Sequence, residues 1–413
     1  MINYNLAKKC RICSSKNLEL ILDLGKQPPA NSLLEMNQLE LSEIKFPLRL
    51  FWCKDCFLVQ LLDIVSKEDL FKHYFYMTSA SKPIVEHFQK YATDIFNEFL
   101  SKQENPFVVE IGSNDGTLLS EFKKLGTMIL GIEPATNLSN MANQSNITTK
   151  NTFFSSEVSK EIAKSRNASV VVANNVIAHI EDLQDLMQGI KILIGNDGVF
   201  IFEVPYVVDL IKKLEFDTIY HEHLSYFSIL PLLKLVEKFG LEIFDIRKQF
   251  VHGGTLRIFV SKKNNFKISD SIDIFINSEY DIGLDTNSIY DVFSTNVQNL
   301  KIILRKKLLE LKEQKKSLFG YGASAKGNVL LNYCDIDNSI LDFIIDTTPL
   351  KQGKFTPGTH IPIFPPEKIR DKGNGDVALL LAWNYEAQIL DKENQFRTNG
   401  GKFLLPIPIP KLI

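Results

Sequence analysis

The sequence predicts an α/β protein with two doubly wound parallel sheets and a small cysteine-rich unit at the N-terminus. Two observations predict the sheets. A strand, a glycine-containing turn and the start of an apolar helix follow one another at 107–118, and the same order occurs again at 317–328. The third observation is a pair of Cys-x-x-Cys motifs within the first sixty residues, which predicts the cysteine-rich unit.

Length and composition describe an ordinary globular protein. The chain has 413 residues, of which 45% are hydrophobic and 23% charged, and its net charge is −2. Two or three domains are therefore expected, and we place them at 1–70, 71–262 and 263–413. The sequence has no basic excess that would favour a nucleic-acid partner. It has neither a signal peptide nor an apolar run of transmembrane length, so we expect a cytoplasmic protein without a membrane partner, and a monomer is compatible with these features.

Four of the five cysteines have a spacing that favours a structural zinc site. Cys10 and Cys13 form one Cys-x-x-Cys pair and Cys53 and Cys56 form the other, and each pair can present two thiolates to one tetrahedral Zn²⁺. Expected strands at 18–24 and 48–51 fill the intervening chain. A redox dithiol and a chance spacing are the alternatives, although a redox centre needs one such pair and disulfides are rare in the cytosol. Four protein ligands would leave no open position for catalysis.

The first strand–turn–helix unit has the features of a nucleoside-binding site. Its strand ends in Glu110, and the turn that follows contains Gly112 and Gly116. This spacing differs from the Gly-x-Gly-x-x-Gly of dinucleotide sites and suits a cofactor without a pyrophosphate. Glu110 can meet a cationic amino group, and Glu133, at the end of the next strand, can accept hydrogen bonds from two ribose hydroxyls. We therefore predict S-adenosylmethionine as the cofactor of a methyltransferase.

Polar side chains follow further strands of the same sheet. Strands are expected at 128–132, 169–173 and 198–204, and Asn174 and Asn175 come directly after the second of these. Because buried amides need hydrogen-bond partners, an Asn-Asn pair at a strand end fits the edge of a ligand better than a core. The same reasoning adds two candidates from the glycine turn, Asn114 and Thr117.

Two of the seven histidines flank a glutamate in the segment Tyr220, His221, Glu222 and His223. A metal site, a surface turn and acid–base chemistry are three interpretations, and the first lacks an obvious third ligand. In an extended segment His221 and His223 share one face and Tyr220 and Glu222 the other, whereas a loop can bring all four together. Histidine titrates near neutrality, glutamate raises its basicity and tyrosine can donate to an oxyanion. Proton abstraction next to a carbonyl needs this set of groups.

His252 and Arg257 lie in a His-Gly-Gly-Thr-Leu-Arg segment near the end of the central domain. The two glycines permit close backbone approach, and Arg257 can bind a phosphate through two hydrogen bonds. An exposed arginine beside a hairpin turn is the alternative.

The second glycine turn contains Tyr321, Ser324 and Lys326 and precedes a helix whose N-terminus favours an anion. Its residue order is not that of a Walker loop. A polar stretch near residue 262 and a long amphipathic helix around 297–311 come before it. The expected strands of this second, smaller doubly wound domain continue at 339–345, 377–382 and 401–407.

The motifs occur in one order along essentially the whole chain. After the Cys-x-x-Cys pairs come Glu-Ile-Gly-Ser-Asn-Asp-Gly, Asn-Asn-Val-Ile-Ala-His, Tyr-His-Glu-His-Leu-Ser-Tyr-Phe-Ser, His-Gly-Gly-Thr-Leu-Arg and Gly-Tyr-Gly-Ala-Ser-Ala-Lys-Gly. This order resembles the nucleotide-sugar C-methyltransferases, and Tyr-His-Glu-His is its most specific part. The resemblance implies an N-terminal zinc-binding domain, a central class I methyltransferase Rossmann-like fold and a C-terminal second Rossmann-like domain. It also implies methylation of a nucleotide-linked keto-deoxysugar at the carbon next to the ketone, in deoxysugar biosynthesis.

The resemblance implies a role for each motif residue. His223 would be the general base that removes the proton from that carbon, while Tyr220 and Glu222 would steady the enolate and orient the base. His179 and Tyr76 would line the same pocket. The expected substrate-binding residues are His252, Arg257, Tyr321, Ser324 and Lys326.

Three alternatives stay open at this point. Tyr76 and the nearby Tyr74 either close over the ligands or belong to a packed aromatic linker, and both fit the family position. A sugar O-methyltransferase can use the same cofactor fold and a histidine base with a hydroxyl nucleophile. A nucleic-acid-binding or protein-binding module on a methyltransferase fold is the alternative from another class.

Overall fold

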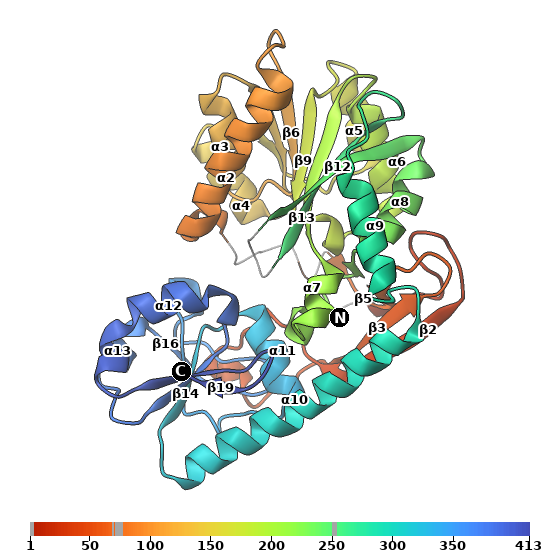
Figure 1. Cartoon of the computed structure of the whole chain (residues 1–413). Helices are drawn as coiled ribbons and strands as arrows, with labels where there is room; N and C mark the ends of the chain where they lie inside the picture. The colour runs from red at the N-terminus through yellow and green to blue at the C-terminus, as the bar shows by residue number, and fades with distance from the viewer. Residues whose placement is uncertain (1–3, 68–69, 71–76, 250–253) are drawn as a thin grey trace.

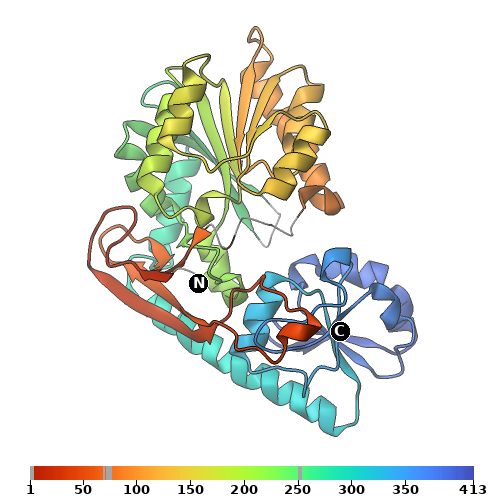
Figure 2. The same ribbon diagram turned by 180° about the vertical axis from the view of Figure 1, so that it is seen from behind.

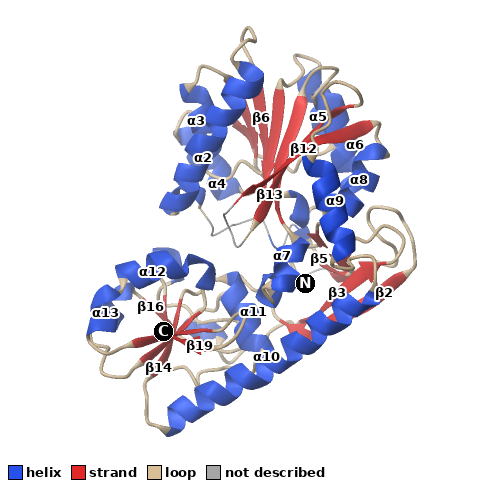
Figure 3. Cartoon of the chain, in the orientation of Figure 1, coloured by secondary structure: helices blue, strands red, loops and turns tan. Residues whose placement is uncertain are grey.

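The computed structural model describes residues 4–67, 70, 77–249 and 254–413, which form four β-sheets flanked by helices (Figures 1 and 3). The expected site residues Tyr76 and His252, and the alternative Tyr74, lie outside the described residues. Within the described ranges we find no helix with the length and apolarity that a membrane span requires.

The largest sheet has seven strands in the order β12-β13-β10-β9-β6-β7-β8, and β13 runs antiparallel to both of its neighbours. Its strands are β6 (Phe107–Ile111), β7 (Met128–Ile132), β8 (Thr149–Lys150), β9 (Val170–Asn174), β10 (Val199–Pro205), β12 (Leu241–Gln249) and β13 (Thr255–Lys262). The strands expected in this region are therefore confirmed to within a few residues. Because β7 and β9 lie on opposite sides of β6, the strand order reverses there, and the carboxyl ends of β6 and β9 form the edge where such sheets bind ligands.

Alternate residues of the central strands pack on opposite faces of this sheet, as a strand buried on both sides requires. Val108 and Val170 belong to one apolar cluster, and their neighbours Val109 and Val171 belong to another. The first cluster is covered by α2 (Lys82–Ile95), α3 (Thr117–Lys124) and α4 (Thr136–Gln144). The second is covered by α5 (Ser156–Ala163), α6 (Leu183–Leu193), α7 (Val207–Lys212), α8 (Ile229–Glu237) and α9 (Ser271–Asp281).

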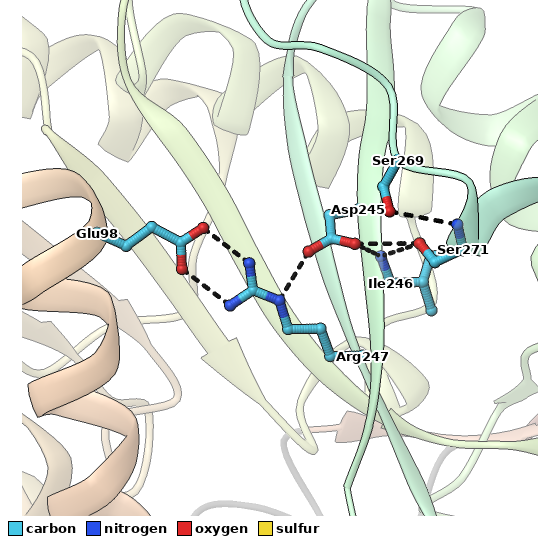
Figure 4. A network of polar contacts seen from close by, with 6 residues as sticks. All are labelled: Glu98, Asp245, Ile246, Arg247, Ser269 and Ser271. Atoms are coloured by element: carbon cyan, nitrogen blue, oxygen red, sulfur yellow. Dashed lines mark hydrogen bonds and ion pairs between the residues drawn. The ribbon is translucent and has the colours of Figure 1, made fainter.

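A polar network ties the edge strand β12 to the π-helical turn Phe96–Leu100, which continues helix α2 (Figure 4). Arg247 donates to both carboxylate oxygens of Glu98, at 2.7 and 2.8 Å, and through Nε to Asp245 at 2.7 Å. Asp245 also accepts from the hydroxyl of Ser271, the first residue of α9. The side chains of Arg247 and Glu98 are each 37% exposed, so this pair contributes about 1 kcal/mol or less to stability.

The N-terminal unit is completed by a strand from the central part of the chain. Its four-stranded sheet has the order β11-β4-β3-β2, with β2 (Leu18–Gln27), β3 (Phe46–Cys53), β4 (Val59–Leu61) and β11 (Ser225–Tyr226). A smaller sheet pairs β1 (Tyr4–Leu6) with β5 (Asp63–Val65). Since β11 follows His223 by two residues, the segment with the Tyr-His-Glu-His motif is hydrogen-bonded directly into this unit.

The C-terminal sheet has the order β16-β15-β14-β17-β18-β19 and is parallel apart from β19. Its elements are β14 (Leu318–Tyr321), α11 (Ala325–Tyr333), β15 (Ile344–Ile345), β16 (Ile363–Phe364), β17 (Val377–Leu380), α12 (Glu386–Lys392), α13 (Asn394–Thr398), β18 (Lys402–Leu405) and β19 (Lys411–Leu412). The long helix α10 (Asn287–Glu313) contacts both β2 and β14 and runs along the whole lower side of the molecule (Figures 1 and 2).

The strand expected at 339–345 is much shorter in the structure, where β15 contains Ile344 and Ile345. Asp337 explains the difference, because its carboxylate accepts hydrogen bonds from the backbone and the hydroxyl of Ser339. These bonds stabilise a turn before the strand, as short polar side chains commonly do.

Candidate active site

One cavity of about 720 Å³ lies between the carboxyl edge of the seven-stranded sheet, the Tyr220–His223 segment and the C-terminal glycine turn. The expected residues that line it are Glu110, Gly112, Asn114, Thr117, Glu133, Asn174, Asn175, His179, Tyr220, Glu222, His223, Ser324 and Lys326. These residues come from distant parts of the sequence, so the fold brings most of the predicted site together in one place.

The turn after β6 needs its glycines for different reasons. Gly112 has a φ of +66°, and a Cβ there would collide with the side chain of Val176. Gly116 has a φ of +81° and does not line the cavity; it precedes α3, and a Cβ there would lie 2.9 Å from Ile147. The backbone between them is therefore held tightly against the following loops, which is the close approach that glycine permits.

The side chains of Asn114 and Thr117 stabilise the turn itself. Asn114 Oδ1 accepts from the backbone N–H of Thr78 at 3.0 Å, and the Thr117 hydroxyl donates to Asp115 at 2.5 Å. Asp115 also accepts from the backbone N–H of Ser79 at 2.9 Å. The short turn that starts at Thr78 is thus fixed against the glycine turn, a relationship that the sequence did not indicate.

Glu110 provides a buried acceptor at the strand end. Glu110 is 3% exposed, and its Oε2 has no hydrogen-bond partner within the described part of the chain. Burial, followed by the charges of Asp115 and Glu133, raises the pKa of Glu110 well above its usual value. A buried carboxyl oxygen without a partner is costly unless a ligand supplies a donor.

Further acceptors lie beside Glu110. The side-chain oxygens of Asn174 and Asn175 are buried and have no partner among the described residues. Glu133 accepts backbone N–H groups from Asn114 and Ala135, each at 2.8 Å, which fixes its carboxylate and uses two of its four acceptor positions. This set fits a ligand that carries a cationic amino group and hydroxyl donors, as S-adenosylmethionine does.

Tyr220 and His223 form a hydrogen-bonded pair on the cavity wall. His223 Nδ1 lies 2.9 Å from the carbonyl oxygen of Thr218, which can only accept, so Nδ1 carries a proton. In the neutral ring Nε2 then holds the lone pair, and the hydroxyl of Tyr220 donates to it at 2.8 Å. The backbone N–H of His223 donates to the carbonyl of Tyr220 at 2.8 Å, so the segment is a turn and not an extended strand.

The segment from Tyr220 to His223 is therefore a loop that brings all four residues to the cavity wall, and not an extended strand with two faces. His221 is 1% exposed, and its Nε2 lies 3.2 Å from the carbonyl of Pro47 in the N-terminal unit. Burial lowers its pKa, so at neutral pH His221 is a neutral donor to Pro47.

His179 packs against the ring of His223, with ring centroids 4.7 Å apart. Its Nδ1 donates to the backbone carbonyl of Glu222 at 2.7 Å. Burial lowers the pKa of His179 to about 4, so this imidazole is neutral at physiological pH. A neutral ring next to His223 avoids the charge repulsion that a second imidazolium would cause.

Two expected substrate-binding residues do not reach the cavity. Arg257 lies opposite Glu203 in the β10–β13 pairing, donates to that carboxylate through Nε at 2.9 Å and stacks 3.6 Å from the centre of the Tyr91 ring. Tyr321 is buried and its hydroxyl donates to Glu393 at 2.6 Å. Their polar groups are thus engaged inside the protein, and neither the phosphate-binding nor the exposed-arginine interpretation of Arg257 is correct.

Two acids that face Lys326 at the C-terminal wall of the cavity were not predicted from the sequence. Glu215 lines the cavity, and burial raises its pKa to about 7, an effect that Lys326 opposes. Asp217 is fully buried and accepts from the indole Nε1 of Trp383 at 2.6 Å, while the Lys326 ammonium lies 5.0 Å from the centre of the same indole. The missed residues lie just before the Tyr-His-Glu-His motif, but only the fold shows that they face Lys326.

The four N-terminal cysteines meet in one cluster. Their Sγ atoms all lie within 4.8 Å of one another, with 3.4 Å between Cys10 and Cys56 and 3.5 Å between Cys13 and Cys53. Four thiolates at Zn–S distances of about 2.3 Å would be roughly 3.8 Å apart, so the cluster fits tetrahedral zinc. The short contacts join the two Cys-x-x-Cys pairs to each other, as expected for one shared metal and not for two separate dithiols.

Known proteins are similar to this chain over nearly its whole length. Family models match residues 10–71 as a zinc-binding domain, 84–246 as a methyltransferase domain and 250–408 as a C-methyltransferase C-terminal domain. The C-methyltransferase NovU of Streptomyces niveus is 35% identical over 407 residues, which cover 98% of this chain and 96% of NovU.

Solved structures match parts of the chain at much lower identity. Magnesium protoporphyrin IX methyltransferase ChlM from Synechocystis PCC 6803 is 12% identical, with a TM-score of 0.34 over 44% of this chain and 84% of ChlM. An S-adenosylmethionine-dependent methyltransferase from Clostridium acetobutylicum is 10% identical, with a TM-score of 0.35 over 43% of this chain and 92% of that protein. The assignment therefore rests on NovU and the family models: the chain belongs to the C-methyltransferase family and is an S-adenosylmethionine-dependent enzyme with a zinc-binding N-terminal domain.

Proposed function

We propose that this C-methyltransferase acts on a nucleotide-linked keto-deoxysugar and methylates the carbon next to its ketone, with His223 as the general base. The observation that carries the proposal is the 2.8 Å hydrogen bond between Tyr220 and His223 on the cavity wall. It supplies one group that can take a proton and one that can donate to an oxyanion, side by side. The family assignment favours carbon over oxygen as the methyl acceptor and sets aside the O-methyltransferase and binding-module alternatives.

The two groups can act together on one substrate. With Nδ1 bonded to Thr218, His223 offers Nε2 as the base. Before a C–H proton can reach Nε2, the Tyr220 hydroxyl must leave it, and the ketone oxygen of the substrate is a suitable new acceptor. When the Tyr220 hydroxyl turns from Nε2 to the ketone oxygen, it exposes the base. It then also stabilises the negative charge that develops on the ketone oxygen, as a hydrogen-bond donor in an oxyanion hole does.

Glu222 and His179 support this pair. The Glu222 backbone carbonyl accepts from His179 Nδ1, which fixes the ring that packs against His223. The Glu222 side chain adds a carboxylate to the cavity wall, where it can orient sugar hydroxyls and favour the protonated form of the base. Because His179 is neutral and its Nδ1 proton is bonded to the Glu222 carbonyl, its Nε2 can only accept a hydrogen bond.

The methyl donor is held by the residues at the carboxyl edge of the seven-stranded sheet. When bound, S-adenosylmethionine supplies an electrophilic methyl group. Glu110 is the acceptor for its amino group, Glu133 for the ribose hydroxyls, and Asn174 and Asn175 offer amide oxygens between them. Holding both reactants in line can contribute up to roughly 7–11 kcal/mol of barrier reduction.

The nucleotide part of the substrate is assigned to the C-terminal wall. Ser324 and Lys326 line the cavity there, and Lys326 brings a cation that suits a diphosphate. We also propose that the chain divides into three domains, 1–70, 71–262 and 263–413. The substrate would bind between the second and third domains, since both contribute residues to the cavity wall.

Incubation of the protein with S-adenosylmethionine and nucleotide-linked 4-keto-6-deoxysugars tests the proposal. Mass spectrometry should detect a product heavier by one methylene, and NMR should place the new methyl group on the carbon next to the ketone. A methyl group on a hydroxyl oxygen, or the absence of transfer across a panel of such sugars, would contradict the proposal.

A further inference from the structure

We propose that Asn31, a residue of the zinc-binding unit, is a positioning residue for Glu222 in the active-site cavity. The amide Nδ2 of Asn31 donates to Glu222 Oε1 at 2.6 Å, across 191 positions of sequence. Asn31 does not line the cavity itself, whereas Glu222 does. The inference rests on the proposed function, because it gives Glu222 a role in that chemistry.

The segment around Asn31 is held firmly on its other side. Asn328 of α11 donates through Nδ2 to the carbonyl of Ala30 at 2.6 Å, and Ala30 is 5% exposed. Leu34 and Phe355 exchange backbone hydrogen bonds of 2.9 and 2.8 Å. Asn31 therefore projects from a piece of chain that is anchored on helix α11 and on the backbone of Phe355, so its amide has a fixed position beside Glu222.

A second contact joins the zinc site to the same catalytic segment. Arg11 lies between two of the cysteine ligands, and its guanidinium donates to the carbonyls of Leu224 at 2.5 Å and Leu61 at 2.9 Å. Strand β11 then pairs Ser225 and Tyr226 with β4. The N-terminal unit thus holds the catalytic segment at Glu222, at Leu224 and along β11.

The chemistry of the Asn31 contact predicts what it does. An amide N–H can only donate, so Asn31 favours the ionised carboxylate of Glu222 and fixes the plane of that group. An aspartate at position 31 would instead bring a second carboxylate to the same place, and two carboxylates in contact share a proton, which raises the pKa of the pair. The pH dependence of turnover therefore reports on this contact and not merely on folding.

The test compares Asn31→Ala and Asn31→Asp with the wild-type full-length protein. Asn287→Ala is the matched control, because Asn287 also donates its amide to a carboxylate, Glu19, at 2.8 Å, but on the exposed surface. We expect Asn31→Ala to lower kcat roughly 10–100-fold, with the affinity for S-adenosylhomocysteine unchanged. We expect Asn31→Asp to move the acidic limb of the kcat–pH profile upward by about one unit or more. Asn287→Ala should behave as the wild type in both respects.

Hydrogen–deuterium exchange supplies a readout that does not need turnover. Asn31→Ala should raise deuterium uptake in peptides covering 216–226 while leaving those covering 107–117 unchanged. Unchanged exchange at 216–226 in Asn31→Ala would overturn the inference, and so would an unshifted pH profile in an active Asn31→Asp. If the wild type methylates no keto-sugar, the proposed function fails, and the exchange data still decide whether Asn31 holds the segment.

Discussion

Tyr220 donates a 2.8 Å hydrogen bond to Nε2 of His223, and the carbonyl of Thr218 fixes the direction of that bond by accepting from Nδ1. The base and the oxyanion donor are therefore paired with each other until a substrate arrives. Each group is satisfied in the resting protein, so neither carries the penalty of an unpaired buried polar group.

Replacement of Tyr220 by phenylalanine keeps the ring and removes the donor. Turnover should fall roughly 10²–10³-fold, the usual loss for one oxyanion-stabilising donor, while the Kd for S-adenosylhomocysteine stays unchanged. Tyr290→Phe is the control, because it removes another buried tyrosine hydroxyl, one that donates to the carbonyl of Leu284 at 2.9 Å outside the cavity. Equal turnover of Tyr220→Phe and wild type would contradict the role of Tyr220.

The affinity for the cofactor should rise with pH through the pKa of Glu110. Burial raises that pKa well above its usual value, and a cationic amino group binds the ionised form, so binding releases a proton. In Glu110→Gln the pH dependence should disappear and the Kd should increase roughly 10–100-fold. Calorimetry with S-adenosylhomocysteine at several pH values measures both effects. Glu121→Gln alters an ion pair with Lys124 outside the cavity and should change neither. A pH-independent wild-type affinity would be inconsistent with this role of Glu110.

Glu215 should make the protein less stable as pH rises towards neutrality. Burial raises its pKa to about 7 from 4.5, so the folded state prefers the protonated form. This contribution to the free energy of unfolding is complete below pH 4.5 and is lost as pH rises to 7, and the loss is at most roughly 3.4 kcal/mol. Denaturant titrations of the wild type and Glu215→Gln at pH 5 and 8 should show a stability difference that changes with pH. A constant difference would show that Glu215 does not titrate in this way.

Zinc removal should loosen the N-terminal unit. Elemental analysis should find one zinc per chain, and Cys53→Ser should lose the metal and lower the melting temperature, because metal-binding free energy is part of folding free energy. Cys334→Ser is the control, since Cys334 is buried in the C-terminal part, away from the cluster. Retention of full zinc by Cys53→Ser would argue against the four-cysteine site.

The sequence predicted those features that depend on neighbouring residues. The strand that ends in Glu110, the glycine turn and the cysteine pairs are local patterns, and each was found where it was expected. Arg257 shows where this reasoning fails, because its partner Glu203 lies opposite it on a neighbouring strand, and the register between strands decides that the pair is buried. Asn31 and Trp383 were missed for the same physical reason: their partners, Glu222 and Asp217, are more than 160 residues away.

Deuterium exchange at the sugar carbon, measured without S-adenosylmethionine, tests the central claim most directly. A nucleotide-linked 4-keto-6-deoxysugar is incubated in D₂O with the wild type or with His223→Ala, and the mass of the recovered sugar is followed over time. We predict uptake of one deuterium with the wild type and uptake at the uncatalysed rate with His223→Ala, which should still bind S-adenosylhomocysteine. Wild-type exchange rates in His223→Ala would contradict the assignment of His223 as the base.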